Sequence, residues 1–294
     1  MGAARIFTGE GFRPSSKLQQ AGVTWRFAAY FLMITITLIT ILPLVWLFYS
    51  SLKPTAEIIR YPMALPQNPS LDNFFRAWTL GNLGVALQNS FIYTISATLI
   101  TLFLALGAAF GITKFGFKKS AAFFTAIFAL GLMIAVHAVI IPLFILQRGL
   151  GLLNTRIGVI IPYVAFDLPM SIMIAISYVR SIPDAIIESA EIDGAKYRYV
   201  FWKMIVPLST PVIATMVILS FLRHWNEFIF VFIFTTRTAL RSLPVAITQF
   251  AGRDMIEFGM QYAALVIGII PMIAFYICFH AQLIKGFGEG SLKE

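Results

Sequence analysis

The sequence predicts an all-α polytopic membrane protein with six transmembrane helices. Of its 294 residues, 59% are hydrophobic and 12% are charged, and the mean hydropathy is +0.84. Soluble globular proteins carry about 25% charged residues. Six apolar runs are long enough to cross the bilayer core, which takes about 20 helical residues. These runs cover roughly residues 27–49, 85–113, 121–146, 157–179, 208–234 and 258–284.

The Lys and Arg residues predict the orientation in the membrane. Six spans place both termini on one side, together with the connections near residues 114–119 and 181–207. That side carries 13 Lys and Arg residues, and the opposite loops carry eight. Because Lys and Arg are enriched in cytoplasmic segments, we expect both termini and the 181–207 loop in the cytoplasm. The same bias accounts for the net charge of +9 without nucleic-acid binding.

The ends of the chain and its longest connection complete the layout. We expect a flexible cytoplasmic tail over residues 1–24, a membrane domain over 25–286 and a second cytoplasmic tail over 287–294. The connection 53–83 contains four prolines. Within it, residues 71–80 have the pattern of a short amphipathic helix at the membrane interface, with an ordinary structured loop as the alternative.

The polar loop over residues 181–207 has the start and stop signals of a short helix. Ser181 and Asp184 fit the S-x-x-D capping pattern, and Pro183 lies in the first turn, where its missing N–H costs nothing. Gly194 can end the helix in a left-handed conformation. A solvated connector is the alternative, but it leaves these signals unexplained.

The predicted helix has a face of small residues. Ile186, Ala190 and Gly194 fall on one side of it, at positions i, i+4 and i+8. A second short helix is expected over 196–206, before Pro207 interrupts the chain. Together these features predict a helix–turn–helix on the membrane surface.

The sequence lacks the motifs of an enzyme or an ATPase. The nearest approach to a phosphate-binding loop is Gly111 to Gly116, which is followed by Phe117 where the motif requires Lys. The three His residues lie in different spans without metal-ligand spacing, and Cys278 is the single cysteine. We therefore expect no catalytic residue, cofactor or metal in this chain, and an energy source outside it.

Two of the three charged residues inside the predicted spans lie in one cluster, residues 223–227. Arg223 and Glu227 are four residues apart and can meet on one helix face. An unpaired charge at the bilayer centre costs about 2.5–3.5 kcal/mol, so the cluster is expected to face protein or water. It could line a translocation path or gate, or it could clamp the helices together. Asp167 in the fourth span poses the same choice.

The polar loop resembles the EAA signature of permease subunits of binding-protein-dependent ABC importers. The signature is E-A-A, three residues, Gly, nine residues and I-x-L-P. The matching residues are Glu188-Ser189-Ala190, Gly194 and Met204 to Pro207, with the spacing kept. Ser189 replaces an Ala, and the other two replacements are conservative.

Further motifs resemble the carbohydrate-uptake branch of these permeases. They are Asn89-Ser90, GLLNT at 151–155, SIP at 181–183, EIDGA at 191–195 and WNEF at 225–228. The chain is similar to the smaller, six-span maltose-type permease. The resemblance implies a MetI-like core over about 85–284, with the first span added outside it.

The resemblance also implies a partner set. Such permeases sit in the bacterial inner membrane with a second, related permease, two cytoplasmic ATPases that bind ATP and Mg, and an extracytoplasmic solute-binding protein. The EAA helix is then the coupling helix that docks on an ATPase. An ion-coupled secondary transporter is the alternative, and a membrane scaffold is a third possibility. The resemblance leaves the transported sugar open.

Two groups of site residues follow from the resemblance and the polar cluster. The ATPase-coupling residues are expected to be Glu188, Ser189, Ala190, Glu191, Asp193, Gly194 and Pro207. The candidates for the translocation path or gate are Asn89, Asp167, Arg223, His224, Asn226 and Glu227.

Overall fold

The computed structural model describes residues 16–115, 118–250 and 257–291, and all regular structure in these ranges is helical. The α-helices are α1 (Ser16–Ser50), α2 (Thr55–Arg60), α3 (Asp72–Leu80), α4 (Leu83–Lys114), α5 (Lys118–Gly131), α6 (Val136–Gly149), α7 (Arg156–Ser181), α8 (Asp184–Ile192), α9 (Tyr197–Val200), α10 (Val206–Leu208), α11 (Thr210–Trp225), α12 (Ile229–Phe234), α13 (Leu243–Thr248) and α14 (Phe258–Ser291). A π-helical turn, Phe201–Ile205, joins α9 to α10, and a 3-10 turn, Thr238–Leu240, precedes α13.

The predicted fold class is confirmed. Among the described residues, α1, α4, α7 and α14 are each long and apolar enough to cross a membrane. Two bent helix pairs, α5 with α6 and the α9–α10 segment with α11, raise the number of candidate spans to six. The expected amphipathic helix at 71–80 is present as α3.

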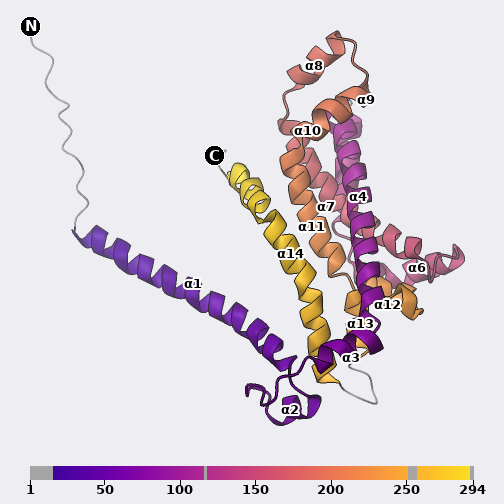
Figure 1. Cartoon of the computed structure of the whole chain (residues 1–294). Helices are drawn as coiled ribbons and strands as arrows, with labels where there is room; N and C mark the ends of the chain where they lie inside the picture. Colours follow the sequence, from indigo (N-terminus) through magenta and orange to yellow (C-terminus); the bar gives the residue numbers. More distant parts are fainter. Residues whose placement is uncertain (1–15, 116–117, 251–256, 292–294) are drawn as a thin grey trace, which may run out of the picture.

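The core of the bundle is formed by α4, α7 and α11, with α14 against α11 (Figure 1). Helices α8 and α9 lie at one end of the bundle, and α2, α3 and α13 lie at the other (Figure 1). These ends are called the α8 end and the α3 end below. Helix α1 stands away from the bundle and contacts α14 near the α3 end. At this contact the ring centroids of Trp46 and Tyr262 are 5.3 Å apart.

The third span is two helices and not the single one expected. α5 and α6 meet at an angle of 97°. The turn between them begins after Gly131, which lies so close to α7 that an added Cβ would be 2.9 Å from Cγ of Pro169. The turn residues 132–135 are as apolar as their neighbours, so the hydropathy pattern gave no sign of the break.

The fifth span ends earlier than expected. α11 stops at Trp225, and the chain continues through three non-helical residues into the separate helix α12. The expected single helix over 208–234 is therefore wrong. The side chains that stabilise this break belong to the candidate site and are described below.

Helical structure reaches into both stretches that we expected as tails. α1 begins at Ser16 and α14 ends at Ser291. The segment after Ser16 contains Lys, Leu, Gln and Ala, which favour helix even without an apolar face. Residues 1–15 and 292–294 lie outside the described residues.

Candidate functional site

The loop between α7 and α11, residues 182–209, forms the α8 end of the molecule and is called the α8 loop below. Its first helix begins at Asp184, directly after Pro183, whose own side chain cannot cap it. The expected cap by Ser181 is wrong, because the Ser181 hydroxyl donates to the Tyr178 carbonyl at 2.7 Å and belongs to α7. Proline at the helix entry still fits, since it removes an N–H that would have no partner.

The end of α8 follows the prediction from Gly194. This residue has φ +78°, a left-handed conformation that an L side chain rarely adopts. The Gly194 N–H donates to the Glu191 carbonyl at 3.0 Å, and the Ala195 N–H donates to the Ala190 carbonyl at 2.9 Å. This pair of bonds is the Schellman motif, and it fixes the direction in which the chain leaves α8.

The predicted coupling residues lie on different sides of α8. Ala190 is buried, and with Ile187 it joins the apolar cluster at the ends of α4 and α7. Glu188 and Glu191 are exposed, and Ile192 at the tip of the helix is 86% exposed. The Ser189 hydroxyl donates to the Ala185 carbonyl at 2.7 Å, so the residue that departs from the EAA pattern satisfies its polar group within its own helix.

Two cavities flank α8. The larger, of about 1060 Å³, separates α8 from the helix that follows it, and its lining includes Ser189, Asp193 and Gly194 together with Trp202. The expected face of Ile186, Ala190 and Gly194 also borders this cavity. The smaller, of about 520 Å³, lies on the other side and is lined by the acidic residues Asp184, Glu188 and Glu191 with Lys114 and Arg180.

The second helix of the α8 loop runs from Tyr197 to Leu208 and includes the π-helical turn. We expected Pro207 to end this helix, but the helix continues through Pro207, and the chain bends by 75° at Ser209. The π-helical turn ends two residues before Pro207, and the Val206 N–H closes it by donating to the Phe201 carbonyl. This wider turn accommodates a residue that has no N–H to donate.

Asp167 in α7 is the centre of a polar cluster inside the bundle. Its Oδ1 lies 3.2 Å from Nη1 of Arg223, and its Oδ2 accepts a hydrogen bond from the Ser220 hydroxyl. The expected pairing of Arg223 with Glu227 is wrong, because α11 ends between the two residues and the i, i+4 geometry is lost. Asp167 is 2% exposed, whereas the side chain of Arg223 is 48% exposed.

His224 extends the same cluster to a third helix. Its Nδ1 lies 3.1 Å from the Thr98 hydroxyl of α4, and its Nε2 lies 3.3 Å from the Tyr163 carbonyl of α7. Its ring also stacks on the Tyr163 ring at 5.3 Å. Asp167 and His224 therefore join α4, α7 and α11, which is the geometry of a clamp.

Asn226 and Glu227 occupy the break between α11 and α12. The Asn226 amide donates to the Leu222 carbonyl at 2.8 Å, at the end of α11. Oε1 of Glu227 accepts from the Phe230 N–H at 3.0 Å, at the start of α12. Glu227 thus satisfies an N–H that the start of α12 leaves without a helical partner. The Asn226 amide adds a second bond to a carbonyl that already accepts from the Asn226 N–H, and Asn226 remains exposed.

Asn89, the last path candidate, lies near the α3 end of α4 and is fully buried. Its amide donates to the carbonyls of Ala239 at 2.8 Å and Arg241 at 3.1 Å. Its Oδ1 accepts from Nη2 of Arg156 at 3.2 Å. The structure thus places Asn89 as an anchor of the loop before α13 and away from the Asp167 cluster.

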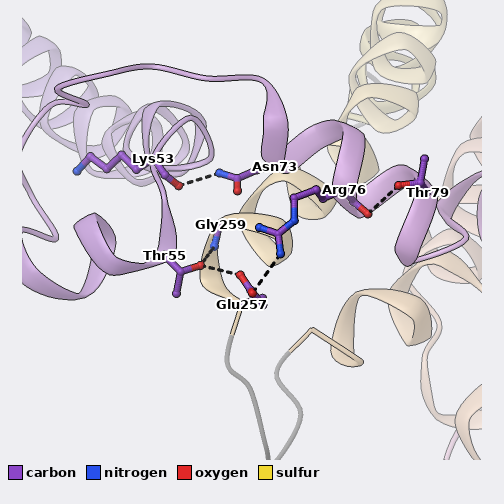
Figure 2. A network of polar contacts seen from close by, with 7 residues as sticks. All are labelled: Lys53, Thr55, Asn73, Arg76, Thr79, Glu257 and Gly259. Carbon is purple, nitrogen blue, oxygen red and sulfur yellow. Dashed lines mark hydrogen bonds and ion pairs between the residues drawn. The ribbon is translucent and has the colours of Figure 1, made fainter.

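A polar network at the α3 end was not predicted from the sequence. Figure 2 shows the Glu257 carboxylate between Thr55 and Arg76, with Oε2 3.1 Å from the Thr55 hydroxyl and Oε1 3.3 Å from Nη2 of Arg76. The Asn73 amide donates to the Lys53 carbonyl at 2.7 Å. The network ties the connection 53–83 to the start of α14. The only signal in the sequence is an acidic residue directly before an apolar span, which favours a helix N-terminus.

Comparisons with known proteins agree with this architecture. The family model described as binding-protein-dependent transport system inner membrane component matches residues 104–286. The chain is 32% identical over 272 residues to the diacetylchitobiose uptake system permease protein NgcG of Streptomyces coelicolor, covering 91% of this chain and 90% of that one. It is also 32% identical over 252 residues to the sulfoquinovosyl glycerol transport system permease protein SmoH of Agrobacterium fabrum, covering 85% and 88%.

A solved structure has the same fold. It is a chain of a bacterial ABC transporter involved in the import of the acidic polysaccharide alginate, and it matches with a TM-score of 0.76 at 22% identity. The match covers 93% of this chain and 99% of that one. From the family model and the relatives, this chain belongs to the family of binding-protein-dependent transport system inner membrane components.

Proposed function

We propose that this chain is the permease subunit of an ATP-driven ABC importer for a sugar or sugar derivative, and that it forms half of the translocation path. Membership of the family and the sugar-transport relatives support this proposal. The observation that carries it is the α8 loop, where a short helix exposes Ile192, and where the exposed rings of Tyr199 and Trp202 line an open cavity of about 1060 Å³. Exposed apolar surface next to a concave site is typical of a protein interface.

The α8 loop would face the cytoplasm, as would both termini. The excess of Lys and Arg on that side of the sequence supports this orientation. The α3 end would then face outward and receive the solute-binding protein. The exposed apolar side chains of α1 would contact lipid, since its membrane-spanning part is not buried in the bundle.

The energy would come from two cytoplasmic ATPases that bind ATP and Mg, since the sequence of this chain lacks a phosphate-binding loop. Each ATPase would contact the α8 loop of one permease, and a second, related permease would complete the path. The acidic residues Glu188 and Glu191 would pair with basic groups on the ATPase, while Gly194 keeps the end of α8 compact.

The polar residues inside the bundle would divide between two roles. Asp167 and His224 are buried and have polar partners on three helices, so we assign them to the clamp. Arg223 and Asn226 are exposed in the single chain. These two remain the candidates for the wall of the path, or for contact with the second permease, because polar and charged side chains avoid lipid.

The test is reconstitution of the chain with the proteins that copurify with it. The proposal predicts that an ABC ATPase copurifies, and that proteoliposomes take up a sugar only with ATP and a solute-binding protein. Uptake driven by a sodium or proton gradient, with no ATPase present, would instead establish the secondary transporter.

A further inference from the structure

Helix α4 is fastened by polar side chains at both of its ends. At the α8 end, its last residue is Lys114, whose side chain is only 3% exposed. The Lys114 ammonium donates to the Ile182 carbonyl at 2.6 Å and to Oδ1 of Asp184 at 2.6 Å. Ile182 lies two residues before α8, and Asp184 is the first residue of α8. One buried cation therefore connects α4 to the entry of the α8 loop.

The two partners of Lys114 differ in exposure. The Asp184 side chain is 74% exposed, and an ion pair to an exposed carboxylate is weak because water screens it. The hydrogen bond from the Lys114 ammonium to the Ile182 carbonyl is the better shielded from water, because Ile182 is buried. Apolar packing supports it, since Ile187 and Ala190 of α8 share one buried cluster with Ala109 and other residues of α4.

At the α3 end, three buried side chains of α4 hold the loop before α13. The Asn89 amide donates to the carbonyls of Ala239 and Arg241, and the Tyr93 hydroxyl donates to the Leu240 carbonyl at 2.8 Å. The Ser90 hydroxyl accepts from the N–H of Leu243 at 2.8 Å. This loop exposes residues 236–239 at the surface, while its backbone is bonded to α4.

Between these fastenings α4 is one continuous helix. It has 32 residues, which corresponds to a length of about 48 Å at 1.5 Å per residue. No proline lies within it, whereas α7 contains Pro162 and Pro169 and α14 contains Pro271. An uninterrupted helix moves as a rigid body more readily than one that a proline can kink.

We propose that α4 transmits the movement of the α8 loop to the loop at residues 235–242, and that Lys114 is the positioning residue at the start of this route. This inference rests on the proposed function, because the movement would come from the ATPase. Asn89 is the corresponding positioning residue at the α3 end. Each residue acts through the backbone that it holds, and neither needs to touch the transported solute.

The first test removes the cation with Lys114→Met in the reconstituted transporter. We expect the ratio of solute taken up to ATP hydrolysed to fall by about tenfold, a change of the size that allosteric coupling energies give. Basal ATP hydrolysis and copurification of the ATPase should persist. Lys114→Arg, which keeps a donor for both acceptors, should recover most of the ratio. An unchanged ratio in Lys114→Met would overturn the assignment.

Two variants serve as controls. Lys119→Met removes an exposed charge from the neighbouring helix α5 and should leave the ratio unchanged. Asp184→Asn removes only the charge of the solvent-screened partner and should lower the ratio less than Lys114→Met does. If Lys119→Met lowered the ratio as much as Lys114→Met, the effect would be one of overall charge and the proposal would be wrong.

The second test measures movement of the loop at residues 235–242, at the α3 end of α4. It does not require a stable Lys114→Met variant. A fluorophore on Thr238→Cys, in a Cys278→Ser background, should change its emission when ATP binds to the assembled transporter. Asn89→Ala should abolish this change while a fluorophore on Ile192→Cys still responds to ATP. A normal response at Thr238 in Asn89→Ala would refute the route through α4. Loss of both responses with no ATPase bound would count against the proposed function itself.

Discussion

The α8 loop at the end of the bundle and the Asp167 cluster inside it both contain charged side chains, but they place these side chains in opposite environments. In the cluster, Asp167 and His224 are 2% and 3% exposed and have partners on neighbouring helices. In the α8 loop, Glu188 and Glu191 are exposed, and Ile192 is 86% exposed. The buried members of the cluster are paired within the chain, whereas the α8 loop leaves surface for another protein.

Burial and pairing separate two kinds of polar residue in this permease. Burial with full pairing indicates a stabilising role, because an unpaired charge in the bilayer is costly. Exposure of both apolar and acidic side chains on a rigid helix indicates a contact surface. Substitutions in the two regions should therefore affect different quantities, stability in the cluster and coupling in the loop.

The largest effect should come from Asp167→Ala. Removing the Asp167 carboxylate leaves the buried Ser220 hydroxyl without its acceptor, which costs about 1–3 kcal/mol. The loss of the pair with Arg223 adds little, because that side chain is 48% exposed and water screens its charge. We expect a large fall in the thermal unfolding temperature of the detergent-solubilised protein, measured by the loss of its monodisperse size-exclusion peak. A melting temperature equal to that of the unsubstituted chain would show that the cluster is not a clamp.

Gly194→Ala should have the next largest effect, confined to the α8 loop. The left-handed conformation costs an L residue about 1–2 kcal/mol, although the site has room for a Cβ. We expect the loop to shift and uptake to fall while the bundle keeps its stability. Gly149→Ala is the matched control, because it also has open space around it but no positive φ. Equal uptake by the two variants would contradict a role for the Schellman turn.

Glu188→Lys should impair transport with little effect on the fold. The side chain is exposed, and surface substitutions change the free energy of unfolding by about 0.5 kcal/mol or less. We expect normal insertion and melting but weaker association with the ATPase, measured by quantitative copurification. An unchanged yield of the ATPase would remove Glu188 from the contact surface.

Ser189→Ala should have the smallest effect. The Ser189 hydroxyl donates to the Ala185 carbonyl within α8 and contacts no other helix in that bond. Alanine is the residue of the family signature at this position. The substitution should change the free energy of unfolding by about 0.5 kcal/mol or less. We expect uptake within experimental error of the unsubstituted transporter. A marked change in uptake would show that the hydroxyl contacts the partner.

The sequence was sufficient for the features that local rules determine. The apolar runs gave the all-helical membrane class, and Gly194 gave the left-handed end of α8, because only that conformation closes the Schellman turn. The position of α3 also followed from its amphipathic pattern. These features depend on a few neighbouring residues.

The features that the sequence did not reveal depend on contacts between distant segments. Arg223 pairs with Asp167 of α7 and not with Glu227, because the helix ends at Trp225. The Asn89 amide donates to backbone carbonyls of a loop about 150 residues further along the chain. The Asn-Ser motif at the start of the span therefore could not show that Asn89 anchors this loop. The bend between α5 and α6 lies in an apolar stretch beside Pro169. The hydropathy of such a stretch does not show whether the helix axis continues straight or turns.

Photo-crosslinking from the tip of α8 in the assembled transporter tests most directly whether α8 is the coupling helix. A photoreactive amino acid placed at Ile192, which is 86% exposed, is predicted to crosslink to the copurifying ATPase and to change in yield when ATP binds. The same group at Met63, which is 77% exposed in the connection between α2 and α3, should not reach the ATPase. Crosslinking of the ATPase from Met63, or its absence from Ile192, would contradict the assignment of α8 as the coupling helix.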